Sequence, residues 1–228
     1  MKGSNLGGYL ITFEGGEGSG KSTAVSALAL FLSNKDLGVR RFREPGGTLL
    51  GDEIRKAVHS VNNTVYPETE ALMYQASRAQ LVSEKIIPAL ESGKIVIMDR
   101  FTDSSLAYQG MGRGLGIEKI TMLNNFSTRG LVPDLTFLLD IDPEIGLERK
   151  KESRLEMNRL DLEKIDFHRK VRKAYLDLVE SDGDGRWVAI DASHPWSEIS
   201  NEILGKTETR LREAGLIEGN LPSPERRG

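Results

Sequence analysis

The sequence contains no cysteine among its 228 residues, which excludes disulfide bonds, thiolate metal sites and cysteine nucleophiles. This absence suits a reducing compartment, and we expect a cytoplasmic protein. No apolar run approaches the roughly 20 residues of a membrane span. The first eight residues, MKGSNLGG, lack the apolar segment of a signal peptide and are expected to form a flexible leader. We therefore expect no contact with a membrane.

An excess of positive charge is also missing. The net charge is -3, so the chain as a whole has no attraction for nucleic acid, and any site for a polyanion must be a local cluster of basic groups. The three histidines, His59, His168 and His194, are far apart and show no metal-ligand spacing. We expect them to be structural.

Apolar runs of strand length alternate with helical patterns along most of the chain. Strands that alternate with helices in this way predict right-handed crossovers and a five-stranded parallel sheet with helices on both faces, an α/β fold. No repeat or shift of composition marks a second domain, so we expect one domain over residues 9–217 and a disordered tail over residues 218–228. The predicted strands are Tyr9–Glu14, Val39–Arg43, Ile95–Asp99, Leu135–Asp140 and Trp187–Asp191.

A glycine-rich stretch follows the first predicted strand. The spacing Gly15-x-x-x-x-Gly20-Lys21-Ser22 matches the phosphate-loop pattern, and a predicted helix follows it. Glycines let the backbone N–H groups point at a phosphate, while the lysine neutralises charge and the serine hydroxyl ligates Mg²⁺. The alternative is a plain turn between strand and helix. The predicted nucleotide site comprises Gly15, Gly16, Glu17, Gly18, Ser19, Gly20, Lys21, Ser22 and Thr23.

Two charged residues, Asp99 and Arg100, follow the third predicted strand. They lie at the carboxyl edge of the sheet, where open α/β folds bind ligands. There Asp99 can orient the water shell of Mg²⁺, and Arg100 can clamp the phosphates of donor and acceptor. The alternative is a strand-end salt bridge.

Tyr74 and Arg78 are spaced four residues apart on one predicted helix and therefore share a face. A ring that stacks on a base and a guanidinium that bonds its edge would form half of a pyrimidine pocket. From spacing alone, core packing for Tyr74 and a surface charge for Arg78 explain the pair as well.

Four stretches taken together resemble thymidylate kinase, the family that phosphorylates dTMP from ATP. They are FEGGEGSGKST, REPGGT, DRFTDSSLAYQGMGRG and PDLTFLLD, and the resemblance runs from about Tyr9 to Asp191. It implies a P-loop NTPase fold of the nucleoside monophosphate kinase kind. It also implies Mg²⁺ as cofactor, ATP and dTMP as substrates, and a homodimer, for which residues 68–92 or 115–126 are candidate interface segments.

The resemblance also assigns the acceptor side. It implies that Tyr74 and Arg78 meet thymine, and that Arg43 reaches the acceptor phosphate. Ser104, Ser105, Tyr108 and Gln109 are similar to the acceptor-site residues of the family. Ser105 and Gln109 would meet the base edge, and the Tyr108 ring would close the space of a ribose 2′-hydroxyl. The alternative for this stretch is a polar helix start capped by Asp103 or Ser104.

An anion, Glu17, stands inside the glycine stretch. In the family an acidic residue at this position meets the acceptor 3′-hydroxyl or the water shell of the metal; otherwise Glu17 would face solvent. Some members carry arginine at the next position, where this chain has Gly18. Members of the bacterial type supply the cation from a lid, expected here over about residues 148–162, with Arg149 and Arg154 as catalytic residues. The alternative is a solvated basic helix.

We therefore predict a kinase that transfers the γ-phosphate of ATP directly to dTMP, giving dTDP, with Lys21, Asp99, Arg100, Glu17, Arg149 and Arg154 as its catalytic residues. Direct transfer needs positioning and charge neutralisation and no covalent nucleophile. One alternative is a kinase for another nucleoside monophosphate. Another is an ATPase or nucleotide switch without a small-molecule acceptor.

Overall fold

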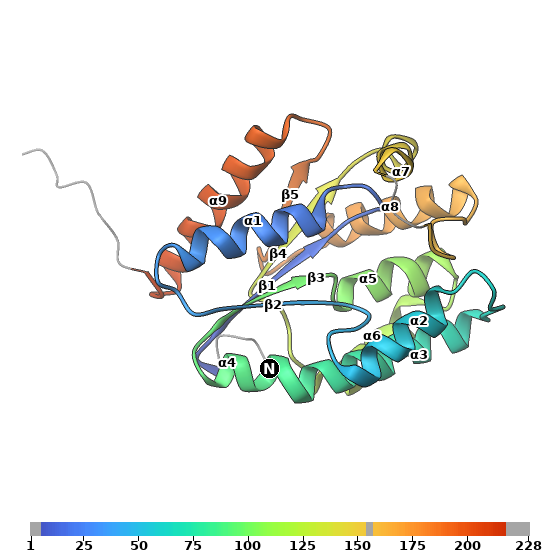
Figure 1. The fold of residues 1–228 in the computed structure, drawn as a ribbon, viewed down its shortest axis with the longest axis horizontal. Helices are drawn as coiled ribbons and strands as arrows, with labels where there is room; N and C mark the ends of the chain where they lie inside the picture. The colour runs from blue at the N-terminus through green and yellow to red at the C-terminus, as the bar shows by residue number, and fades with distance from the viewer. Residues whose placement is uncertain (1–5, 154–156, 218–228) are drawn as a thin grey trace, which may run out of the picture.

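The computed structural model describes residues 6–153 and 157–217. The described chain forms one parallel sheet of five strands in the order β2-β3-β1-β4-β5 (Figure 1). The predicted five-stranded parallel α/β sheet is confirmed, and each strand has its predicted bounds: β1 (Tyr9–Glu14), β2 (Val39–Arg43), β3 (Ile95–Asp99), β4 (Leu135–Asp140) and β5 (Trp187–Asp191).

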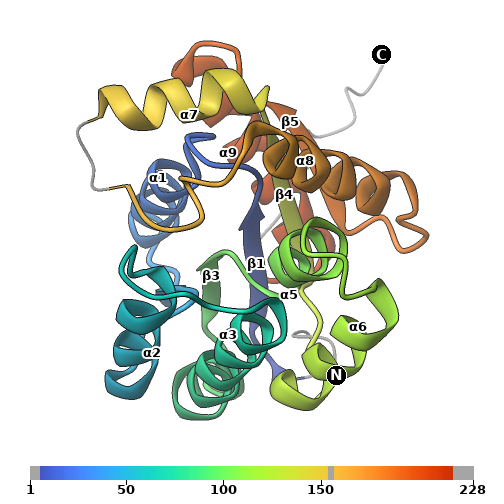
Figure 2. The same cartoon turned by 90° about the vertical axis from the view of Figure 1, so that its right-hand side faces the viewer.

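Helices cover both faces of the sheet (Figures 1 and 2). Two short segments of wide π-turns, η2 and η3, interrupt the helical stretches. The helical elements are α1 (Lys21–Ser33), α2 (Leu49–His59), α3 (Pro67–Leu81), η2 (Val82–Ile86), α4 (Ile87–Glu91), α5 (Thr102–Ser105), η3 (Leu106–Gly112), α6 (Ile117–Thr128), α7 (Pro143–Glu152), α8 (Ile165–Glu180) and α9 (Trp196–Glu213).

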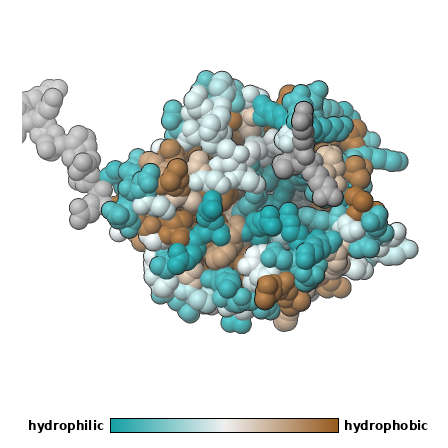
Figure 3. Space-filling view, in the orientation of Figure 1, coloured by the Kyte–Doolittle hydropathy of each residue, from teal (hydrophilic) through white to brown (hydrophobic). Residues whose placement is uncertain are grey.

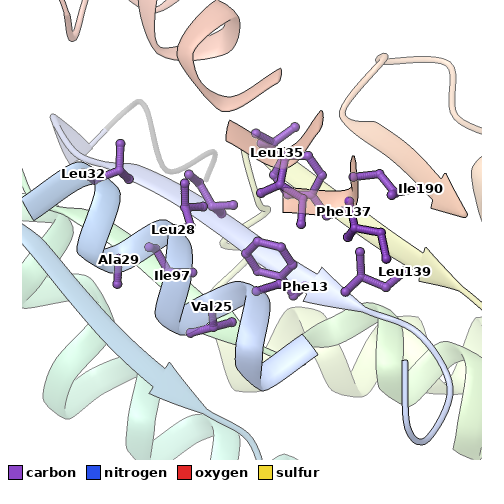
Figure 4. Close-up of a cluster of buried hydrophobic side chains, with 14 of the residues drawn as sticks. Phe13, Val25, Leu28, Ala29, Leu32, Ile97, Leu135, Phe137, Leu139 and Ile190 are labelled. Atoms are coloured by element: carbon purple, nitrogen blue, oxygen red, sulfur yellow. The ribbon is translucent and has the colours of Figure 1, made fainter. Parts of the chain in front are cut away.

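Alternate side chains of β1 belong to hydrophobic clusters on opposite faces of the sheet. Successive strand residues point to opposite sides of a sheet, so Ile11 and Phe13 join the cluster under α1 and α9, whereas Leu10 joins the cluster under α3, η2 and α4. Figure 4 shows the first cluster, in which the ring of Phe13 stacks on that of Phe137 with centroids 5.1 Å apart. Because β1 is buried along its whole length, the glycine stretch that follows it starts from a rigid support.

The long helix at the bottom of Figure 1 is not regular. The sequence predicts one helix over residues 68–92, but the structure inserts the wide turn η2 before Pro88. Proline has no N–H and its ring clashes with the carbonyl four residues earlier in a regular helix, and a π-turn relieves that clash. The helix therefore continues past the proline.

Surface hydrophobic residues do not merge into one patch on the face shown in Figure 3, where they form separate areas among hydrophilic ones. Within the part of the chain that the structure describes, no helix is both long and apolar enough to cross a membrane. The predicted tail, residues 218–228, lies outside the described residues, as do residues 1–5. Leu6, in the predicted leader, packs against the cluster around Leu10.

Candidate active site

The loops that follow the strands at their carboxyl ends, which point toward the viewer in Figure 2, surround one cavity of about 540 Å³. Side chains from the glycine loop, from α2 and α3, from the β3–α5 connection and from α7 line it. The lining residues are Glu17, Gly18, Gly20, Lys21, Ser22, Thr23, Arg43, Glu44, Pro45, Arg55, His59, Tyr74, Asp99, Arg100, Ser104, Tyr108, Gln109, Arg149, Lys150, Ser153, Asn158 and Leu160.

The glycine loop is built to receive an anion. Gly20 precedes α1 with a φ of 90° and no side chain caps the helix, so the first N–H groups of α1 are left for a ligand. The Lys21 ammonium donates to the Gly16 carbonyl at 2.6 Å. Burial, and then the nearby Arg100 cation, lower the pKa of Lys21 to about 8. A buried cation in this position is stabilised by any polyanion that enters the cavity.

A hydroxyl and a carboxylate meet at the start of α1. Ser22 Oγ donates to Asp99 Oδ2 at 2.5 Å, across the sheet edge between β1 and β3. Both groups are hard oxygen ligands of the kind that Mg²⁺ prefers. Among the described residues, no group of three or more histidine, cysteine, aspartate or glutamate side chains could hold a metal by itself, so these two oxygens form at most part of a coordination shell.

Arg100 has an unusual backbone, with a φ of 69° in the left-handed region. This conformation is strained for a residue with a side chain. It turns the guanidinium back over the loop, where it pairs with Glu17 at 2.8 Å, donates to the Gly15 carbonyl at 2.9 Å and lies 5.0 Å from the centre of the Tyr108 ring. The side chain of Asp99 thus contacts Ser22, whereas that of Arg100 contacts Glu17.

Glu17 is not a solvent-facing residue. Its carboxylate also accepts hydrogen bonds from the Tyr108 hydroxyl at 3.0 Å and from the Lys150 ammonium at 3.2 Å. Burial alone would raise the pKa of Glu17, but the cations of Arg100, Lys21 and Lys150 hold that pKa well below its usual range. Glu17 is therefore an ionised carboxylate that gathers cations from three segments.

A second carboxylate, Glu14 at the end of β1, lies fully buried behind Arg100. It accepts hydrogen bonds from the Phe101 N–H at 2.8 Å, the Ser104 hydroxyl at 2.5 Å and the Tyr175 hydroxyl at 3.0 Å. Burial raises the pKa of Glu14 to about 7. The sequence analysis missed Glu14 as a site residue because a single glutamate at the end of an apolar strand carries no motif of its own.

Tyr74 lies in the wall of the cavity, next to the end of α2. Its hydroxyl contacts His59 Nε2 at 3.0 Å. His59, which the sequence analysis assigned to structure, therefore also lines the cavity. Burial, together with the neighbouring Arg55 cation, lowers the pKa of His59 to about 3, so the imidazole is neutral at physiological pH.

Two arginines, Arg43 and Arg55, line the cavity together. Arg43, a predicted residue, lines the cavity at the end of β2, and Arg55 on α2 lies with it. Arg55 donates to the Pro45 carbonyl at 2.9 Å, and burial followed by the Arg43 cation lowers its pKa. Sequence reasoning missed Arg55, although it stands one turn before His59 on the same helix, because no motif marks it.

Arg78 is 1% exposed and does not line the cavity. Its guanidinium pairs with Glu44 at 2.6 Å and donates to the Phe101 carbonyl at 2.9 Å. It also bonds Asn124 and the hydroxyl of Ser105, at 2.7 and 3.0 Å. The proposed contacts of Arg78 and Ser105 with a base stay predictions. In this structure neither residue lines the cavity, and Arg78 pairs with Glu44, which does.

The remaining predicted acceptor-side residues come from the turn after β3. Ser104, Tyr108 and Gln109 all line the cavity, and the wide turn η3 carries the last two. The Arg113 N–H bonds the Tyr108 carbonyl at 2.8 Å, five residues back. Π-turns of this kind occur often at functional sites, and here the turn brings two neighbouring side chains to the same cavity.

Two cations of α7 differ in direction. Arg149 lines the cavity and donates to the Ala192 carbonyl at 2.8 Å, whereas Lys150 reaches Glu17 and also pairs with Asp161 at 2.6 Å. Arg154, the other predicted lid residue, lies outside the described residues. Of the α7 cations in the described part of the chain, Lys150 is thus the one that contacts the Glu17 carboxylate, at 3.2 Å.

Two glycines let α7 lie directly on the glycine loop (Figure 2). A Cβ on Gly18 would stand 1.8 Å from the Gly146 carbonyl oxygen, and one on Gly146 would stand 2.2 Å from the Glu17 carbonyl oxygen. Real Cβ atoms essentially never come this close to a backbone oxygen. No side chain fits at either position while α7 keeps its place.

Comparison with known proteins points in one direction. The family model described as thymidylate kinase matches residues 13–203. The thymidylate kinase of Bacillus cytotoxicus is 47% identical over 206 residues, which cover 90% of this chain and 99% of that protein. The thymidylate kinase of Geobacillus thermodenitrificans is 46% identical over 211 residues, which cover 90% and 92% of the two chains.

Proposed function

The chain belongs to the thymidylate kinase family, and from this premise we propose how its residues divide the transfer of a phosphoryl group from ATP to dTMP. A thymidylate kinase converts ATP and dTMP to ADP and dTDP. The family match favours this activity over that of an ATPase or switch without an acceptor. The roles of individual residues that follow are our proposal.

The donor half of the site is the glycine loop with Lys21. The uncapped start of α1 and the buried Lys21 ammonium suit the terminal phosphates of ATP, because N–H groups and a lysine stabilise their charge at no cost in reorganisation. Thr23 lies at the cavity wall beside them. Ser19 turns its hydroxyl to the Gly16 carbonyl at 3.0 Å and supports the loop.

We propose that Mg²⁺ binds between Ser22, Asp99 and the phosphates of ATP. The support is the donor set: two hard oxygens 2.5 Å apart, with the rest of the shell left to phosphate and water, as is usual for this ion. When bound, the ion would neutralise phosphate charge and orient the donor.

The acceptor half lies between α2, α3 and η3. Tyr74 offers its ring to the base, and Arg43 and Arg55 stand where an acceptor phosphate needs cations. Arg100 extends from between the two halves and pairs with Glu17, so its guanidinium can neutralise charge that develops as the phosphoryl group moves. Lys150 provides the second cation at the same carboxylate. The observation that carries the proposal is that Arg100 and Lys150 both contact the Glu17 carboxylate.

The proposed division is tested by measuring ADP release from Mg-ATP with a panel of nucleoside monophosphates. Lys21→Met should abolish turnover with every acceptor while the far-ultraviolet circular dichroism stays unchanged. Tyr74→Ala should raise the KM for dTMP by about 10- to 100-fold, the value of one lost stacking contact, and leave the KM for ATP within twofold. Equal rises in both KM values would contradict the stacking role.

We also propose that the protein acts as a homodimer through α3 and α6. These two helices pack against each other and carry four exposed large apolar side chains: Leu72, Ile117, Met122 and Phe126, the last 86% exposed. Apolar side chains gathered on neighbouring helices mark candidate interfaces. Sedimentation should give a dimer for the wild type and a monomer for Phe126→Asp. A cytoplasmic location is likewise proposed, since a chain without cysteine suits a reducing compartment.

A further inference from the structure

A fully buried carboxylate, Glu70 on α3, joins three segments that are far apart in the sequence. Its Oε1 accepts a hydrogen bond from Gln109 Nε2 at 2.8 Å. Its Oε2 accepts from Arg113 Nη2 at 2.9 Å and from Arg159 Nη2 at 2.5 Å. Burial opposes ionisation, but hydrogen bonds from Arg113, Gln109 and Arg159 lower the pKa of Glu70. The group is therefore an anion shared between two arginines.

Two of these segments, α3 and η3 with the residue after it, belong to the wall of the acceptor pocket. The third, Asn158–Asp161, lies at the end of the lid. Gln109 lines the cavity, and so does Tyr74, one helical turn after Glu70. Arg159 belongs to the segment Asn158–Asp161, whose residues Asn158 and Leu160 also line the cavity.

Arg159 is the part of that segment that fixes it to the body of the protein. Beyond Glu70, it donates through Nε to the Val58 carbonyl, and its N–H bonds the His59 carbonyl, both at 3.1 Å. These two carbonyls lie at the end of α2, next to the Tyr74 ring. The position of the segment therefore depends on the same residues that shape the acceptor pocket.

The segment in turn holds the cation of α7. Asp161 accepts the Asn158 N–H at 2.7 Å through Oδ2 and the Lys150 ammonium at 2.6 Å through Oδ1. Lys150 also contacts Glu17 at 3.2 Å. Ion pairs at both ends, joined by the short stretch of chain from Arg159 to Asp161, thus connect Glu70 with Lys150 and Glu17.

We propose that Glu70 is a positioning residue: through Arg159 it fixes the segment Asn158–Asp161, and through Asp161 it holds Lys150 at Glu17. The wall of the acceptor pocket and the lid cation then share one anchor. This inference rests on the proposed role of Lys150, and the experiment below separates the two.

The charges around Glu70 supply a matched pair of variants. Arg113 has a second carboxylate partner, Glu163, at 2.7 Å, whereas the ion pair of Arg159 among the described residues is with Glu70. Arg159→Met cuts the link to the segment and leaves Glu70 paired with Arg113, so the fold keeps a compensated carboxylate. Glu163→Gln removes a partly exposed partner of Arg113 and serves as the control.

The test measures kcat, both KM values and the thermal midpoint for each variant. Arg159→Met should lower kcat about tenfold, in the range expected when a catalytic group is misplaced by a fraction of an ångström. Arg159→Lys should recover part of that loss, and Glu163→Gln should stay within twofold of the wild type. A lower thermal midpoint with unchanged kcat for Arg159→Met would show a purely structural contact and overturn the inference.

A double-mutant cycle with Lys150→Met then tests the route. In the Lys150→Met background, Arg159→Met should lower kcat by less than about threefold, because the cation that it positions is gone. If Lys150→Met alone lowers kcat strongly and Arg159→Met still lowers kcat tenfold in that background, the inference is overturned and the role of Lys150 stands. An unchanged kcat for Lys150→Met alone would instead overturn both.

Discussion

Replacing Gly146 by alanine should displace α7 from the glycine loop and slow the reaction with little effect on stability. The added Cβ would stand 2.2 Å from the Glu17 carbonyl oxygen, whereas ordinary contact begins at 3.4 Å. The partner is backbone and cannot rotate away, so α7 has to move by about 1.2 Å. Lys150 lies one turn further along α7 and moves with it, away from the Glu17 carboxylate.

The two contributions to stability nearly cancel. Alanine improves helix propensity by about 1 kcal/mol over glycine, while an overpacked contact costs about 1–3 kcal/mol. The net change is between roughly zero and a loss of 2 kcal/mol, which lowers the thermal midpoint of a chain this size by about 8 °C at most. A displacement of about 1 Å at a catalytic group can cost about 100-fold in rate. We therefore expect Gly146→Ala to act mainly by lowering kcat.

Gly205→Ala is the matched control. Gly205 lies inside α9 (Trp196–Glu213), and a Cβ there would meet nothing within 4 Å. This variant should gain about 1 kcal/mol from helix propensity and keep full activity. ADP release and thermal unfolding are measured for both variants. If Gly146→Ala behaves like Gly205→Ala, more stable and fully active, then α7 does not need its contact with the loop and the reasoning is refuted.

Three further predictions concern groups around the cavity. The pKa of Glu14 is about 7 in the folded state, above its value near 4.5 in the unfolded chain. The folded state therefore binds the extra proton between these pH values, and the free energy of unfolding falls as the pH rises through them. In urea unfolding at several pH values, Glu14→Gln should remove that part of the pH dependence. Arg78→Met should lower the unfolding free energy by about 3–5 kcal/mol, because Glu44 stays buried without its partner; a normal stability with a raised dTMP KM would mark a base contact instead. Ser22→Ala should raise the Mg²⁺ concentration needed for half-maximal rate severalfold, and an unchanged Mg²⁺ titration would contradict its role as a ligand.

Much of the fold could be predicted because the sheet is buried on both faces. The three inner strands, β1, β3 and β4, are short buried apolar runs, and the residue that ends β1 or β3 stands directly before a polar loop. Periodicity and loop spacing therefore predicted the strands, the glycine loop and the Asp99–Arg100 pair. The wide turn η2 was not predicted, because one proline in a long helical pattern permits either a break or a π-turn, and packing against the sheet decides.

The side-chain pairing in the site depended on contacts distant in sequence. The surface alternative for Arg78 is wrong, because the residue is buried and paired with Glu44, 34 residues away, and only the folded chain brings the two together. Its contact with a base stays a prediction. Lys150 contacts Glu17, whereas the predicted Arg149 bonds the Ala192 carbonyl, because of the face that α7 turns to the loop. That face is set by the contact of Gly146 with the loop backbone, which no periodicity in α7 alone reveals.

The geometry of the wide turn η3 constrains the number of residues that the chain can have between Leu106 and Gly112. It holds one residue more than a regular helix of the same rise. If a single residue were deleted from Leu106–Gly112, the turn would close to ordinary α geometry with its flanks in place. The residues inside it would then be redistributed around the helix axis at about 100° each, and Tyr108 and Gln109 would no longer both face the cavity. Homologues and designed variants of this enzyme should therefore tolerate substitutions in this stretch far better than a gap.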